Sequence, residues 1–337
     1  MKKKVISAFA LTFLVLIFGV ALGSVYIQPT EIFNIFLNEF CGFSKEIDEI
    51  NKILILNIRL PRVCIVFFIG AGLALSGAVI QSVLQNPLAS AYGLGISSGA
   101  GLGVTLLIIT GFTSGILGAL LMPIVALVFG IVSVLLTIYV AQKIDKNLAN
   151  NSIILTGMVF SLFINSIMTS LCSVFPQHSP KIILWQSGNF SLKEWWIIIT
   201  FACILSISFV FLYKFHLEMD IMSLGSNQAM SVGVNTQKIT WFLIIVTAIL
   251  TSSAVAFVGI IGFVDLISPH IVRKFFDSQH KYVLPMTMLF GGSFMVLCDI
   301  ISRTIASPSV IPIGSVTAII GAPFFVMVFL KNRSIHD

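Results

Sequence analysis

The side chains of this chain that could carry out chemistry are few, and the least expected is a carboxylate inside an apolar run. Asp265 shares that run with His270, so a proton or ion relay is one chemistry the two could perform. A second candidate is the stretch G-I-S-S-G at 95–99, which matches the G-x-S-x-G motif of hydrolases. That motif requires a strand before its serine. Because this one lies in an apolar helical run, we do not expect serine hydrolysis.

Two glutamines give a different signal. Gln81 and Gln85 stand one helical turn apart in or near an apolar run, and Asn86, which precedes a proline, ends the helix. Polar groups at membrane depth usually face protein or a water-filled path. We therefore treat these three residues as candidates for lining a pathway. The glycines around them predict close helix packing, because small residues on one face let helices approach closely in lipid.

Three arginines, Arg59, Arg62 and Arg303, fall at the ends of apolar runs. The planar fork of arginine suits carboxylate recognition, so these residues could form a docking site. The alternative is that each side chain reaches along apolar surface to the interface between membrane and water. The five cysteines give no such signal, because no two are spaced as C-x-x-C, and neither a metal site nor a disulfide framework is indicated.

These residues must be positioned by a protein dissolved in a bilayer. Apolar residues make up 57% of the 337 and charged residues 9%, whereas soluble domains carry about a quarter charged residues. A spanning helix needs about 20 mostly apolar residues, and in lipid the backbone must satisfy its own hydrogen bonds. The sequence therefore predicts an all-α polytopic membrane protein. We identify ten candidate spans, at roughly 5–27, 63–84, 93–110, 115–141, 153–175, 195–213, 239–258, 259–273, 283–303 and 311–330.

Two of these runs leave alternatives open. The run at 259–273 is short and contains Asp265, Pro269 and His270, so we expect a broken or partly re-entrant helix there. The first run follows three lysines and could be a signal peptide, but its apolar part is long for one. An N-terminus inside the cell places most of the 19 lysines and arginines on the inner side, which predicts that both termini are inside. The net charge of +6 follows from this bias and does not indicate nucleic-acid binding.

The chain is predicted to be one transmembrane domain, 1–337, because no polar interval is long enough to form a core of its own. It contains no G-x-x-x-x-G-K-[ST] motif, so active transport would need an ion gradient or a partner chain. The inner interval 214–238 predicts two short amphipathic helices with exposed Met and Leu side chains. Such a surface favours a binding partner. The alternative is a helical hairpin folded back on the membrane.

Several stretches, taken in order, resemble the FecCD family, the permease subunits of ABC importers for metal chelates, of which the cobalamin importer permease is one. The resembling stretches are R-L-P-R at 59–62, G-A-G-L-A-L-S-G-A at 70–78, Q-N-P-L-A at 85–89, G-L-G-I-S-S-G-A at 93–100, L-G…S-V-G-V-N at 224–235, G-I-I-G-F-V-D-L-I-S-P-H-I-V-R at 259–273, D-x-x-x-R at 299–303 and I-P-I-G-S-V-T-A-I-I-G-A-P-F-F at 311–325. Single stretches are weak signals, whereas the ordered set is specific and spans the chain.

The resemblance implies a type II ABC importer permease fold with ten transmembrane helices in a bacterial cytoplasmic (inner) membrane. It implies a homodimer with the pathway along its axis, surrounded by lipid. Two ATP-binding cassette subunits would sit inside and use ATP and Mg, while this chain binds no cofactor and is not itself an enzyme. One periplasmic or surface-tethered solute-binding protein would dock outside. The cargo would be an iron–siderophore, haem, cobalamin or an oxyanion such as molybdate.

The resemblance also implies roles for particular residues. The arginines Arg59, Arg62 and Arg303 match those that meet carboxylates of the binding protein, and the loop from 147 to 152 resembles the inner gate. The segment 214–238 would be the coupling segment that fits each ATPase. The residues assigned to coupling are Met219, Met222, Leu224, Gly225, Ser226, Asn227, Met230 and Gly233, and those assigned to the pathway or gate are Gln81, Gln85, Asn86, Asn150, Asn151, Ser152, Asp265 and His270.

The chain departs from the family pattern at three places. Asp265 stands where the family usually has glycine, and Val310 stands where it usually has glutamate. The coupling stretch reads L-G-S-N at 224–227 instead of the usual L-G-E-E. These changes could alter the pathway lining, the outer mouth and the ATPase contact, but none breaks the fold. The alternative function is an ion- or proton-coupled secondary transporter, in which Asp265 and His270 would form the relay.

Overall fold

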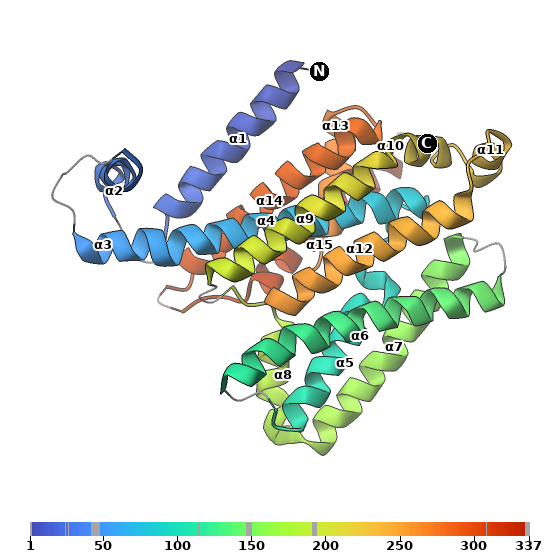
Figure 1. The fold of residues 1–337 in the computed structure, drawn as a ribbon, viewed down its shortest axis with the longest axis horizontal. Helices are drawn as coiled ribbons and strands as arrows, with labels where there is room; N and C mark the ends of the chain where they lie inside the picture. Colours follow the sequence, from blue (N-terminus) through green and yellow to red (C-terminus); the bar gives the residue numbers. More distant parts are fainter. Residues whose placement is uncertain are drawn as a thin grey trace.

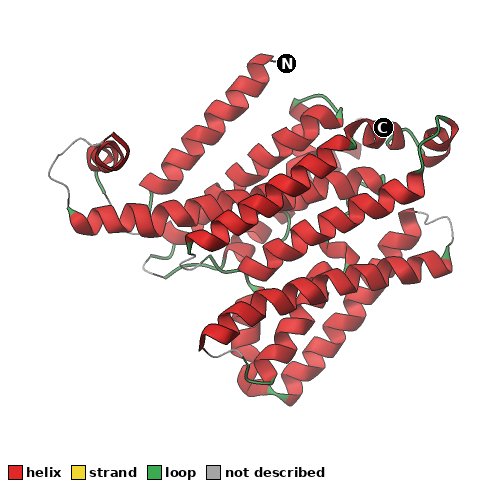
Figure 2. Cartoon of the chain, in the orientation of Figure 1, coloured by secondary structure: helices red, strands yellow, loops and turns green. Residues whose placement is uncertain are grey.

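The structure is a computed structural model that describes residues 2–23, 25, 27–41, 48–112, 115–145, 150–190, 194–307 and 309–333. These residues form helices joined by turns, and no strand occurs among them (Figure 2). The described part contains seven helices that are long and apolar enough to cross a membrane. They are α1 (Lys2–Ala21), α4 (Leu60–Val83, extended outward to Glu49), α6 (Gly115–Ile144), α7 (Asn150–Val174), α9 (Trp195–Lys214), α12 (Thr236–Val258) and α14 (His280–Thr304).

The remaining described helices are not among these seven. Two of them, α5 (Ile96–Ile109) and α15 (Ile313–Arg333), are apolar. The others are α2 (Pro29–Cys41), α3 (Glu49–Ile53), the π-helix η1 (Leu54–Arg59), η2 (Tyr92–Leu94), η3 (Pro176–His178), α8 (Ser179–Gln186), α10 (His216–Met222), α11 (Ser226–Ser231) and α13 (Val264–Phe275).

The predicted all-α membrane fold is confirmed, and each of the ten apolar runs overlaps a helix of the described part. The number of crossings and the inside position of both termini stay predictions. The run at 259–273 is broken, because Gly259 and Phe263 have positive φ and the helix α13 begins only at Val264. At 12 residues, α13 is about 18 Å long, which is too short to cross the hydrocarbon alone.

One boundary differs clearly from expectation. The sequence predicted a polar outer interval at 28–62, but the chain is helical from Glu49, through η1, to the end of α4. Within η1 the backbone follows a π-helix, a rare geometry that is often found at functional sites. This segment leads directly into the first turn of α4, so Arg59 and Arg62 lie together at the N-terminal end of that helix.

The helix α4 is the centre of the bundle, and nearly all of its residues are buried. It packs against α9, α12, α13 and α14, while α5, α6 and α7 form a neighbouring group that joins through α12 (Figure 1). The small-residue face predicted on α4 makes the closest approach, since a Cβ on Gly77 would lie 1.9 Å from the backbone oxygen of Asp265. The sequence therefore places glycine where the backbones of α4 and α13 meet.

The bundle has two chemically different ends. At one end lie the short helices α10 and α11, together with the start of α1, where Lys4 Nζ donates to the Phe275 carbonyl at 3.0 Å. We call this the coupling end. At the opposite end, where α2 and α3 lie in Figure 1, the three predicted docking arginines gather, and we call this the arginine end.

Candidate functional site

The arginine end is built around one buried carboxylate. Asp299 on α14 is fully buried, and its Oδ1 accepts from Arg62 Nε at 2.9 Å and lies 2.8 Å from Arg62 Nη2. Its Oδ2 lies 2.8 Å from Arg303 Nε, one helical turn away on α14. The carboxylate therefore joins the N-terminal end of α4 to the C-terminal end of α14.

Two of the arginines also close the end of α1. Arg59 donates to the carbonyl oxygens of Val20, at 3.2 Å, Ala21, at 2.8 Å, and Val25. Arg303 Nη2 donates to the Gly19 carbonyl at 2.9 Å. The last carbonyls of a helix have no partner within the helix and carry its negative end, so cations are favourable there. Arg59 and Arg303 thus hold α1 against α4 and α14.

The exposure of the three arginines differs in a way that matters for docking. Arg59 and Arg303 are 4% and 5% exposed, whereas the Arg62 side chain is 17% exposed. In this conformation only Arg62 is partly accessible to a carboxylate from outside. The docking role of all three stays a prediction. Sequence reasoning did not assign a role to Asp299, although its four-residue spacing from Arg303 is an ion-pair signal on a helix.

At the coupling end, the predicted Met and Leu surface divides into two halves. Met219 and Met222 are buried against the bundle, while Leu224, Met230 and Val232 are exposed, Leu224 to 70%. Gly225 and Gly233 have positive φ and terminate the short helices, as glycine allows. The backbones of Ser226 and Asn227 begin α11, but their side chains lie outside the described residues. The segment therefore offers an apolar outer surface on an anchored base.

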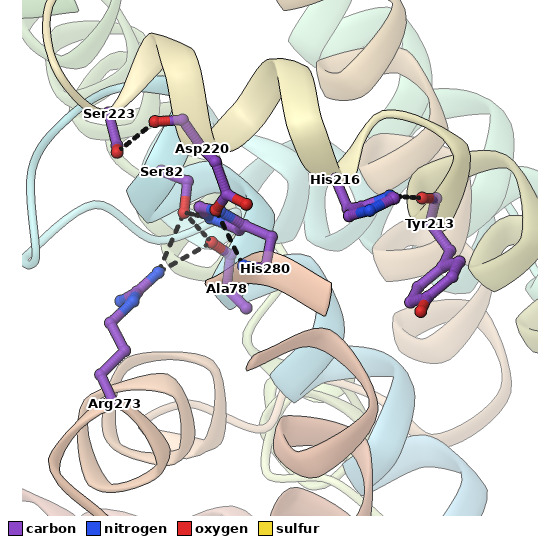
Figure 3. Close-up of polar contacts among 8 residues, drawn as sticks. All are labelled: Ala78, Ser82, Tyr213, His216, Asp220, Ser223, Arg273 and His280. Atoms are coloured by element: carbon purple, nitrogen blue, oxygen red, sulfur yellow. Dashed lines mark hydrogen bonds and ion pairs between the residues drawn. The ribbon is translucent and has the colours of Figure 1, made fainter. Parts of the chain in front are cut away.

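A polar network anchors this base, as Figure 3 shows. Asp220 Oδ1 on α10 accepts from the backbone N–H of His280 at 2.8 Å and contacts its ring Nδ1 at 2.6 Å. The other ring nitrogen lies 2.5 Å from Ser82 Oγ on α4. Arg273 Nη2 on α13 donates to the same Oγ at 3.0 Å. One chain of contacts thus connects α10 to α14, α4 and α13.

The predicted pathway glutamines lie at the coupling end, beside this network. Arg273 Nη1 donates to Gln81 Oε1 at 2.7 Å, and Gln81 Nε2 donates to the Leu266 carbonyl at 3.2 Å. Gln85, which has a φ of 48°, donates to the carbonyl of Met222. The two side chains therefore tie α4 to α13 and to the coupling segment. Asn86, at the turn after α4, accepts the Leu88 backbone N–H through its Oδ1 at 2.8 Å.

The other pathway and gate candidates are not brought together. Asp265 is 1% exposed, and its Oδ2 accepts from Ser90 Oγ in the turn between α4 and α5. No hydrogen bond or ion pair joins Asp265 to the half-buried His270 among the described contacts, so a relay pair is not assembled. Asn150, Asn151 and Ser152 begin α7, with Asn151 exposed. The preceding gate positions, 147–149, lie outside the described residues.

The helix α7 carries a polar stripe on an exposed face. Ser166, Thr169, Ser170 and Ser173 are exposed, and each hydroxyl donates to the carbonyl four residues earlier, at 2.9 to 3.0 Å. Asn165 is exposed beside them. Polar side chains at membrane depth are expensive when they face lipid. This face of α7 is therefore expected to meet water or another protein surface.

Known proteins resemble the chain along nearly its whole length. The FecCD transport family matches residues 11–331. An Fe(3+)-citrate import permease of Bacillus subtilis is 31% identical over 92% of this chain and 89% of its own length, and a molybdate import permease of Haemophilus influenzae is 32% identical over 86% and 84%. An inward-facing structure of a metal-chelate type ABC transporter superposes with a TM-score of 0.85 at 28% identity, covering 98% of this chain and all of that one. On this full-length agreement of sequence and fold, the chain belongs to the FecCD transport family.

Proposed function

We propose that the chain is the membrane permease subunit of an ATP-driven importer for a metal chelate or a related metal-containing solute. The observation that carries this proposal is the exposed apolar surface of the coupling segment, formed by Leu224, Met230 and Val232. It projects from an end of the bundle that is held by polar contacts, and the chain has no phosphate-binding loop of its own. A surface of this kind is suited to a partner chain that supplies the energy.

The partner would be a pair of ATP-binding cassette subunits, one on each copy of the permease. Each would receive α10 and α11 in a cleft, and ATP and Mg would be used there and not by this chain. The coupling residues that face outward, Leu224 and Met230, would enter the cleft, whereas Met219 and Met222 would keep the segment seated on the bundle. The single transmembrane domain, 1–337, would thus supply only the conduit.

In a homodimer, the polar stripe of α7 would face the second copy across the pathway. Exposed Ser166, Thr169 and Ser173 on a spanning helix are suited to line a water-filled path between two subunits. The start of the same helix holds the proposed gate residues, Asn151 and Ser152. In a homodimer with its pathway along the α7 helices, the gate residues and the polar stripe would therefore both line the same pathway.

A solute-binding protein would dock at the arginine end, with Arg62 as the accessible contact and Arg59 and Arg303 as its support. Cargo selection would lie mainly in that protein. Relatives named for ferric citrate and molybdate differ in cargo at similar identity, which supports a permissive pathway. We therefore propose the class of metal-containing anionic or chelated solutes as the cargo. The secondary-transporter alternative has less support, because Asp265 bonds to Ser90 and not to His270.

The ATPase contact can be tested by co-purification. Leu224→Asp together with Met230→Asp places charge on the exposed coupling surface without touching the buried methionines, so we expect the ATPase subunit to be lost from the purified complex. Val310→Asp is the matched control, because it adds a charge to another exposed apolar residue, at the arginine end. Retention of the ATPase by the double variant, at the level of the control, would contradict the proposal.

A further inference from the structure

The helices α4 and α14 are fastened to each other at both ends. At the arginine end, Arg62 on α4 pairs with Asp299 on α14 at 2.8 Å. At the coupling end, Ser82 on α4 contacts the His280 ring on α14 at 2.5 Å. Each helix is about 36 Å long, so the two contacts lie near opposite faces of the membrane.

The middle of the pair is closely packed. A Cβ on Gly70 of α4 would lie 2.5 Å from the Gly291 carbonyl oxygen, and one on Gly291 would lie 2.2 Å from Ala74 Cβ. Such contacts leave no room for the helices to slide or separate without repacking, because well-packed surfaces shift between discrete arrangements. The α4–α14 pair is therefore expected to move as one body.

The coupling segment holds this body through one carboxylate. The first backbone N–H groups of a helix have no partner within it, and the residue before α14, Gln279, provides no side-chain cap. Asp220, from α10, takes that place by accepting the His280 backbone N–H at 2.8 Å and by contacting its ring at 2.6 Å. An anionic acceptor at the positive end of a helix is favourable. The cap of a membrane-spanning helix is thus supplied by the segment that would bind the ATPase.

We propose that Asp220 is a positioning residue for energy coupling: its contact with His280 transmits movement of the coupling segment to the α4–α14 pair, and through that pair to the arginine end. This inference depends on the proposed function. A second tie, in which the Gln85 amide donates to the Met222 carbonyl, joins the coupling segment to the turn after α4 and does not reach the start of α14. Asp220 provides the side-chain contact that does.

The test measures whether docking of the binding protein at the arginine end changes the rate of ATP hydrolysis by the ATPase. The complete complex of permease, ATPase and binding protein is reconstituted in nanodiscs, and ATP hydrolysis is measured with and without the binding protein. Asp220→Ala should retain the ATPase subunit and its basal hydrolysis, but lose about fivefold or more of the stimulation by the binding protein, the scale of typical coupling between sites. Asp220→Asn, which keeps an acceptor oxygen, should retain most of the stimulation.

The matched control is Ser231→Ala, because Ser231 lies on the same segment and bonds only within its own turn, to the Gln228 carbonyl at 2.7 Å. If Asp220→Ala does not assemble, Ser82→Ala breaks the same chain of contacts from within α4 and should also reduce stimulation. Full stimulation in an assembled Asp220→Ala complex, or in Ser82→Ala, would overturn the inference. A wild-type complex that the binding protein does not stimulate would instead overturn the proposed function, and this inference with it.

Discussion

The arginine end and the coupling end of α14 use charge differently. At the arginine end two guanidinium groups, those of Arg62 and Arg303, pair with one fully buried carboxylate, while Arg303 and Arg59 donate to the last carbonyls of α1. At the coupling end a single carboxylate on a surface segment reaches one histidine, and the contacts continue through a serine. The first arrangement fixes helices that are already neighbours, while the second connects the bundle to the segment for which we propose a partner protein. The fully buried carboxylate Asp299 holds helices together, whereas the partly exposed carboxylate Asp220 has the proposed role of transmission.

The comparison is tested most severely by removing the carboxylate of the arginine end. Asp299→Ala leaves Arg62 and Arg303 close together without their counter-ion, and removing one partner of a buried ion pair typically costs about 3–5 kcal/mol. We expect little folded protein in detergent and a strongly lowered midpoint of SDS-induced unfolding. A variant that unfolds at the wild-type midpoint would contradict the structural role of this cluster.

Removing one arginine should have a smaller effect, because it also relieves repulsion among the remaining cations. Arg303→Ala loses the contacts to Asp299 and to the Gly19 carbonyl, at a cost of about 1–3 kcal/mol. Arg62→Ala should be less destabilising still, since its side chain is partly exposed and makes no contact with α1 among the described hydrogen bonds. The measurement is again SDS-induced unfolding of both variants. If Arg62→Ala were less stable than Arg303→Ala, the exposure of an arginine would not predict its contribution to stability.

The smallest effect is expected for an ion pair at the same end of the molecule but on its surface. Lys52 Nζ lies 3.0 Å from Glu39 Oε2, and the two side chains are 32% and 45% exposed. Exposed pairs contribute little because water and salt screen them and the side chains lose entropy. Lys52→Ala should leave the unfolding midpoint unchanged within error. A loss comparable with that of Arg303→Ala would mean that the outer helices α2 and α3 carry more of the stability than their exposure suggests.

The sequence alone located the apolar helices, because length and apolarity are enough to identify a candidate span. It also indicated the break before α13, from the unusual polar residues of that run. It could not give the contacts between distant positions, such as Arg62 with Asp299 or Asp220 with His280, since no local pattern links them. The assignment of Gln81 and Gln85 to the pathway rested on their polarity alone. The sequence does not show in which direction each side chain points, and in the structure they bond to Arg273 and to the Met222 carbonyl.

The coupling segment illustrates a related limit. Its methionines and leucine were all predicted as an exposed surface, yet Met219 and Met222 are buried. A seven-residue helix has too few turns for periodicity to separate its two faces. Burial of those two residues depends on where the bundle lies, which is a tertiary property. The exposed remainder, Leu224 and Met230, keeps the predicted character.

The central claim is that this chain is a conduit driven by a partner that hydrolyses ATP. It is tested most directly by reconstituting the purified permease in liposomes, alone and with its ATPase and binding protein, and measuring uptake of radiolabelled ferric citrate and molybdate. We predict accumulation of one of these solutes only in the complete system and only with ATP, and none by the permease alone under an imposed proton or sodium gradient. Gradient-driven accumulation by the permease alone would contradict the account.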